Sequence, residues 1–109
     1  DNYFNLTKKL PSVKILSPVQ LQQLNVNTQT DITFICTEDI VKVGIYSSID
    51  NGVTWSLVTE LNTPADIQHT FKWIPTQQTD MGRIRIDGYL GIDPNIVGAS
   101  DTSDRFIVK

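Results

Sequence analysis

Ser47-Ser48-Ile49-Asp50-Asn51-Gly52-Val53-Thr54-Trp55 is the stretch of sequence that decides the fold. It separates two runs, residues 41–47 and 54–59, in which apolar and polar side chains alternate as they do in half-buried strands. Asn51-Gly52 favours a tight turn, because Gly52 takes a positive φ without steric cost and Asn51 tolerates one better than most residues. The stretch therefore predicts a β-hairpin, with the Trp55 ring folded back over the turn.

The same loop matches the Asp-box, a hairpin motif of sialidases and other β-propellers. The expected structural residues of this hairpin are Ser48, Asp50, Gly52, Thr54 and Trp55. The motif occurs once in 109 residues, whereas a propeller repeats four-stranded blades around a channel. The chain is too short for a propeller, so the motif indicates a hairpin and does not identify a reaction.

Other runs rich in β-branched and aromatic residues predict further strands, at residues 13–16, 21–24, 32–37, 68–73, 83–89 and 104–108. In the run before the hairpin, Val41, Val43 and Ile45 are expected to point inward and Tyr46 outward. Residues 77–82 and 91–103 are predicted to be connections. About seven or eight antiparallel strands without a helical period indicate an all-β fold, an immunoglobulin-like β-sandwich. A barrel of similar strand number is the alternative.

The domain is expected to span residues 13–109. Residues 1–12 show no sustained periodicity and contain Pro11, so they are predicted to be a linker or N-terminal arm. The total length suits one domain with one core. The polar beginning and the absence of a signal peptide suggest a segment of a larger protein.

Composition excludes several classes of function. The net charge is −3, and no cluster of Lys or Arg exceeds Lys8-Lys9, so a nucleic-acid partner is not expected. No apolar run approaches the roughly 20 residues that a membrane span needs, so no membrane insertion is expected. Cys36 is the only cysteine and cannot form an internal disulfide, which leaves the redox compartment open.

Several segments together resemble the immunoglobulin-like, fibronectin-III-like modules of bacterial surface and secreted proteins, and the related domain of fungal cell-wall proteins of the Kre9/Knh1 type. The segments that carry this resemblance are Ile15-Leu16-Ser17-Pro18, Ile45-Tyr46-Ser47, Asp50 to Trp55, Phe71-Lys72-Trp73-Ile74-Pro75, Ile84-Arg85-Ile86 and Ser100 to Val108. The order and spacing of these segments are more specific than any one of them. The family is non-catalytic, so the resemblance implies a structural or binding module.

No group of residues predicts catalysis, a metal site or a cofactor. His69 stands alone, without the second imidazole or nucleophile that such chemistry needs. Cys36 alternates with Ile32 and Phe34, which indicates a buried, inert thiol. Oxygen ligands for calcium near residues 87–104 stay an open alternative, since four aspartates lie there: Asp87, Asp93, Asp101 and Asp104.

The best candidates for ligand contact are Tyr46 and Tyr89, both expected to face outward, together with the loop over residues 90–103. Trp55 is assigned to the hairpin and Trp73 to the core face. Arg83, Arg85 and Arg105 are expected to face solvent, with Asp87 as a cross-strand partner.

The leading hypothesis is a non-catalytic spacer or presentation module of a larger secreted, cell-surface or virion protein, whose partners are neighbouring domains of the same polypeptide. The alternative is a module that binds carbohydrate or protein through Tyr46, Tyr89 and the 90–103 loop. A sialidase-class fragment would require further Asp-boxes in a longer parent chain.

Overall fold

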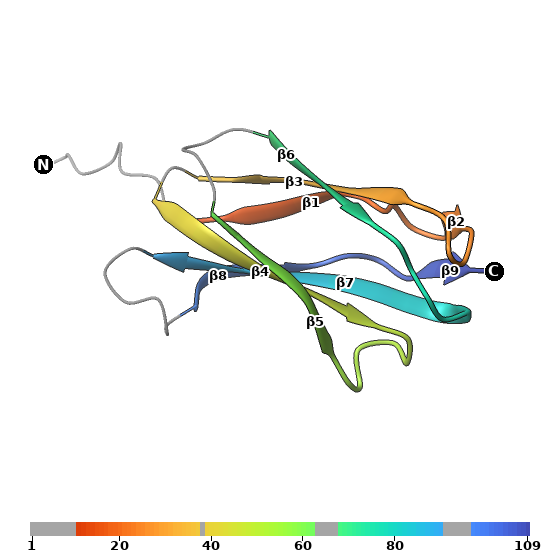
Figure 1. Ribbon diagram of the computed structural model, residues 1–109. Coiled ribbons are helices and arrows are strands. Elements are labelled where there is room, and N and C mark those ends of the chain that lie inside the picture. Colours follow the sequence, from red (N-terminus) through yellow and green to blue (C-terminus); the bar gives the residue numbers. More distant parts are fainter. Residues whose placement is uncertain (1–10, 38, 63–67, 91–96) are drawn as a thin grey trace, which may run out of the picture.

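The computed structural model describes residues 11–37, 39–62, 68–90 and 97–109, which fold into nine strands (Figure 1). In chain order these are β1 (Val13–Ser17), β2 (Gln23–Leu24), β3 (Thr30–Cys36), β4 (Ile40–Ser48), β5 (Ser56–Asn62), β6 (Gln68–Trp73), β7 (Thr79–Leu90), β8 (Val97–Thr102) and β9 (Phe106–Val108). None of the residues in these ranges forms a helix able to span a membrane. The predicted arm at residues 1–12 lies almost entirely outside the described residues.

Two sheets pack face to face, which confirms the predicted all-β sandwich and makes the barrel alternative wrong. The smaller sheet has the order β1-β3-β6, and the larger has the order β2-β9-β7-β4-β5, with β8 also paired to β7. Figure 1 shows the smaller sheet lying over the larger one. All pairs are antiparallel except β2 with β9, which are parallel. The expectation of purely antiparallel strands is therefore wrong at this edge.

The core lies between the sheets and is made of alternate residues of the central strands. Ile32, Phe34 and Cys36 of β3 are buried, as the alternation in that run predicted. They face Val43 and Ile45 of β4 and the buried isoleucines of β7 across the sandwich. Burying apolar side chains contributes about 1.5–3 kcal/mol each, so these central strands provide most of the stabilisation.

Three details of the strands differ from the sequence prediction. Residues 91–103 were expected to be a connection, yet Val97–Thr102 form β8, because pairing with β7 and not apolar alternation defines this strand. Val41 was expected to point inward but is 44% exposed, because a bulge between Ile40 and Lys42 shifts the phase and buries Ile40 instead. Residues 77–82 were expected to be a connection, yet β7 already begins at Thr79. This start could not be found from alternating apolar residues, because Thr79 and Asp80 are polar. It is a strand because it pairs with the short β9.

The chain enters and leaves the sandwich at opposite ends. Val13, at the start of β1, lies against Gly88 near the end of β7: a Cβ placed on Gly88 would be 2.9 Å from Val13 Cγ2. Val108, at the end of β9, pairs with Thr79 at the start of β7. At about 3.3 Å per residue, the stretch of β7 between these points is roughly 30 Å long. Figure 1 shows the beginning of β1 and the C-terminus at opposite ends of the molecule.

Candidate functional site

The outer face of the larger sheet carries a group of aromatic and charged side chains. Cross-strand partners lie on the same face of an antiparallel pair, and β4 and β7 pair Lys42 with Tyr89 and Tyr46 with Arg85. These four alternate with the buried residues of the same strands, so they face away from the core. Together with Trp55 we call them the aromatic face: Lys42, Tyr46, Trp55, Arg85 and Tyr89.

The structure brings the two predicted contact tyrosines together. The Tyr46 ring lies over Gly44, where an added Cβ would be 3.1 Å from its Cε1 and 3.3 Å from its hydroxyl oxygen. A glycine in a strand often marks such a close approach. The side-chain hydrogen bond with Tyr46, followed by burial, raises the pKa of Tyr89 to about 12. Because the pKa of Tyr89 is raised on folding, its contribution to stability is present below pH 10 and is lost as the pH rises through about 12.

Arg85 links the tyrosines to Trp55. Its guanidinium carbon lies 4.5 Å from the ring centroid of Tyr46 and 4.9 Å from that of Trp55, within the range of cation–π attraction. Its Nε lies 3.3 Å from Oδ1 of Asp87, which also accepts a hydrogen bond of 2.8 Å from the Ser100 hydroxyl. The Arg85 side chain is 29% exposed, so it is held by its neighbours yet remains open to solvent.

A second cation lies on the same face. Lys42 Nζ is 5.4 Å from the ring centroid of Tyr89 and 3.8 Å from Oε1 of Glu60. This pair is exposed, so its ion pair contributes little to stability. The aromatic face therefore combines two cations with aromatic rings and has acidic groups at its border.

The loop after β4 positions Trp55. Asp50 accepts hydrogen bonds from the Ser48 hydroxyl at 2.6 Å and from both the hydroxyl and the backbone N–H of Thr54. These bonds, with that of Ser48 the largest, lower the pKa of Asp50 to about 2. Asn51 and Gly52 have positive φ values, and Gly52 lies against the Trp55 ring. The ordered turn therefore holds this ring above β4 and β7.

Sequence reasoning missed the part that Trp55 and Arg85 play on this face. Trp55 was assigned to the hairpin alone, and Arg85 was expected only as a charge partner of Asp87. The signal was present in the register: Arg85 is directly opposite Tyr46 once β4 and β7 are paired. That pairing joins strands far apart in the sequence, so local periodicity could not reveal it.

The predicted ligand loop and the aspartates of the calcium alternative lie partly outside the residues that the structure describes. In the 90–103 segment, Leu90 ends β7 and residues 97–102 form β8, while residues 91–96, including Asp93, lie outside the described residues. Asp87 pairs with Arg85, whereas Asp101 accepts a hydrogen bond of 2.7 Å from the backbone N–H of Ile15. Within the described ranges, no three Asp, Glu, His or Cys side chains gather in a way that could hold a metal ion.

His69 and Cys36 both lie in the smaller sheet, away from the aromatic face. The His69 ring stacks on Phe34 with centroids 5.3 Å apart, and its Nε2 is buried with no hydrogen-bond partner among the described residues. Cys36 is 1% exposed. The buried position expected for Cys36 is therefore confirmed.

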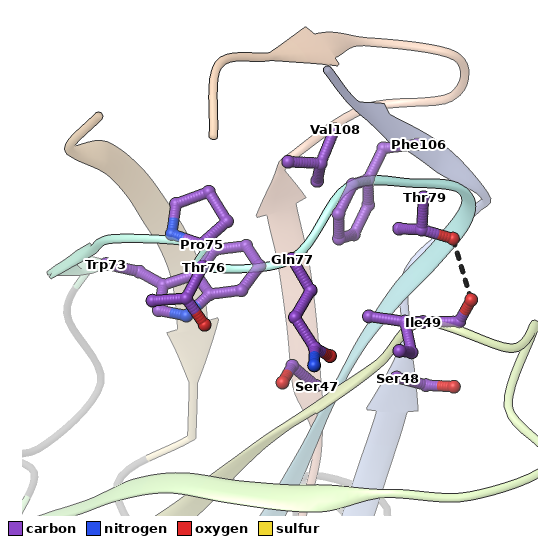
Figure 2. Close-up of a pocket in the computed structure, with 10 residues that line it drawn as sticks. All are labelled: Ser47, Ser48, Ile49, Trp73, Pro75, Thr76, Gln77, Thr79, Phe106 and Val108. Atoms are coloured by element: carbon purple, nitrogen blue, oxygen red, sulfur yellow. Dashed lines mark hydrogen bonds between the residues drawn. The ribbon is translucent and has the colours of Figure 1, made fainter. Parts of the chain in front are cut away.

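A small cavity opens between the sheets near the C-terminal end of the chain (Figure 2). Its volume is about 70 Å³, and its lining residues are Ser47, Ser48, Ile49, Trp73, Pro75, Thr76, Gln77, Thr79, Phe106 and Val108. The Thr79 hydroxyl donates a hydrogen bond of 2.7 Å to the Ile49 carbonyl oxygen at its rim. Pockets for small-molecule ligands are several times larger, about 300–1,000 Å³, so this cavity suits a few water molecules.

Comparison with known proteins gives similarities of fold alone. No family model matches the chain, and no curated protein matches it significantly. Among solved structures it is similar to the fibronectin(III)-like modules of Clostridium thermocellum CbhA, with 20% identity over 89% of this chain and 94% of that one and a TM-score of 0.49. It is also similar to a CARDB domain from Pyrococcus furiosus, solved in complex with di-metal ions, with 21% identity over 100% of both chains and a TM-score of 0.47.

Proposed function

We propose that this domain is a non-catalytic spacer or presentation module of a larger secreted, cell-surface or virion protein. The observation that carries this proposal is that the chain enters at one end of the sandwich and leaves at the other. A neighbouring domain on each side would be held apart by the length of β7, roughly 30 Å. The resemblance in motif order to the fibronectin-III-like modules of bacterial surface and secreted proteins supports the same role.

The sandwich is suited to hold such a separation. β7 runs the length of the larger sheet and pairs with β4 on one side and with β8 and β9 on the other. Its core isoleucines, Ile84 and Ile86, are fully buried. A strand fixed on both edges and packed on one face cannot bend independently of the sheet, because bending would break hydrogen bonds and core contacts together.

Single-molecule energy transfer between dyes on cysteines at positions 12 and 109 tests the spacer role, in a background with Cys36→Ala. We expect one narrow distance distribution, at or above roughly 30 Å. The control pair is 12 and 37, which should give high transfer because the Thr37 backbone N–H donates a hydrogen bond to the Ser12 carbonyl oxygen at 3.1 Å. A broad or short distribution for the long pair would contradict the proposal, and so would turnover of glycosides or esters by the purified domain.

The second candidate is a carbohydrate-binding module, favoured by the side-by-side placement of Tyr46 and Tyr89 on an open sheet face. The aromatic rings offer flat apolar surfaces beside hydroxyl groups, which suit a sugar ring. Tyr89→Ala should then weaken binding of any glycan retained on an array by about tenfold, the effect of losing one aromatic contact of about 1.4 kcal/mol.

Lys72→Ala is the matched control for this experiment, since Lys72 is an exposed residue on the smaller sheet. Its glycan binding should equal that of the unmodified protein. If no glycan binds, or if Tyr89→Ala leaves binding unchanged, the tyrosines are not a carbohydrate site.

A further inference from the structure

Arg85 differs from the other two arginines that the structure describes, Arg83 in β7 and Arg105 just before β9. Arg83 donates hydrogen bonds to Asn51 Oδ1 at 2.8 Å and to the Ser103 carbonyl oxygen at 2.9 Å, and Arg105 donates to the Asp80 carbonyl oxygen at 3.3 Å. The Nε of Arg85 lies near Asp87 at ion-pair distance but makes no hydrogen bond. Its terminal nitrogens also have no hydrogen-bond acceptor among the residues that the structure describes. Within the part of the chain that the structure describes, the terminal N–H donors of Arg85 are therefore unused and can bind a ligand.

The surroundings of Arg85 hold it ready to bind. Tyr46 and Trp55 each lie within 5 Å of its guanidinium carbon. Contacts with ring faces use the flat sides of a guanidinium, while its N–H bonds point outward in the plane. A side chain fixed in this way loses less conformational entropy when it binds an anion. The planar fork of N–H donors matches a carboxylate, to which it can donate two parallel hydrogen bonds.

The position of the site argues against a peptide ligand bound by strand addition. Arg85 and Tyr46 belong to β7 and β4, which are central strands with neighbours on both sides. Their backbone N–H and C=O groups are used within the sheet, and strand addition requires a free edge. A ligand on this face must therefore be recognised by side chains, here by aromatic rings and a guanidinium.

We propose that the aromatic face binds an acidic polysaccharide, with a sugar carboxylate on the terminal nitrogens of Arg85 and sugar rings against Tyr46 and Tyr89. This inference deepens the carbohydrate-binding candidate and rests on it. Lys42, beside Tyr89, provides a second cation along the same face. A polymer with a carboxylate on each sugar presents the same group to both cations.

Titration calorimetry with polygalacturonate, and with the same polymer after full methyl esterification, tests the proposal. The unmodified protein should bind the acid form at least tenfold more tightly than the ester. Arg85→Gln should lose at least tenfold for the acid form only. Arg85→Lys should restore part of this loss, because it keeps the charge but lacks the planar fork.

Arg105→Gln is the matched control, since it removes the same charge at the residue just before β9 and should leave binding unchanged. An equal loss in Arg105→Gln would overturn the proposal, because binding would then follow net charge. Equal binding of the acid and ester forms would overturn the role of Arg85. If Tyr89→Ala then abolished the binding of both forms, the face would still be a site for neutral glycans. Absence of binding to both polymers overturns the acidic-polysaccharide site.

Two further measurements separate an acidic polysaccharide from an acidic protein segment and cover the case in which Arg85→Gln does not fold. If poly-glutamate binds as tightly as polygalacturonate and depends equally on Arg85, the carboxylate belongs to an acidic protein segment and the polysaccharide proposal is overturned. If Arg85→Gln fails to fold, the indole N–H resonance of Trp55 in the unmodified protein serves instead. It should shift with the acid polymer and not with the ester, and no shift would overturn the proposal.

Discussion

Phe34→Ala is expected to lower the free energy of unfolding by about 3–5 kcal/mol, the usual cost of removing a buried aromatic side chain. Phe34 lies in the middle of β3, is fully buried, and is paired with Ile15 of β1 and His69 of β6. Its ring also stacks on the His69 ring. Truncation would remove contacts with both neighbouring strands and with the facing sheet, and the cavity left behind adds to the cost.

Chemical denaturation followed by tryptophan fluorescence measures this change. For a domain of this size the corresponding fall in melting temperature is about 10 °C or more. Val53→Ala is the control, since Val53 is 80% exposed and surface substitutions usually change stability by less than about 0.5 kcal/mol. A loss below about 1 kcal/mol for Phe34→Ala would mean that this side chain is not part of the core.

Local pattern was enough to predict the strands whose one face is buried and whose other face is polar. The runs that became β3, β6 and the part of β4 after Val41 are of this kind, because alternation survives wherever one side of a strand meets the core. It failed at Val41, where a bulge changes the phase, and at Thr79, where β7 begins with polar residues. Both failures come from pairing with distant strands, which a local window does not contain.

The aromatic face shows the same limit for function. Tyr46 and Tyr89 could be identified as outward-facing from alternation alone, but their contact depends on the register of β4 with β7. Arg85 could be identified as a surface charge, whereas the absence of a hydrogen-bond acceptor for it among the described residues could not be predicted. The hydrogen-bond partners of a side chain depend on strands that are distant in the sequence. The residues of the site could therefore be predicted from the sequence, whereas the contacts between them could not.

Gly82→Ala is expected to destabilise the domain by about 1–3 kcal/mol through overpacking. Gly82 is buried and paired with Phe106 across β7 and β9. An added Cβ would lie 2.5 Å from Cε1 and 2.8 Å from Cδ1 of the Phe106 ring, closer than atoms in real structures approach. The ring is 1% exposed and packs edge-on against Trp73 with centroids 6.1 Å apart, so it has little room to move.

Gly44→Ala is the matched control, because the three atoms nearest to its added Cβ all belong to the Tyr46 side chain on the outer face, the first at 3.1 Å. That ring is partly exposed and can shift, so the loss of stability should be smaller than for Gly82→Ala.

A double-mutant cycle identifies the cause of the Gly82 effect. Phe106→Leu removes the ring atoms that the new methyl group would meet, so Gly82→Ala should cost at least about 0.5 kcal/mol less in the Phe106→Leu background than alone. Urea denaturation of the two single variants and the double variant gives this coupling energy. Additive losses would contradict the expectation, because they would show that the methyl group is opposed by the backbone of β7 and β9 and not by the Phe106 ring.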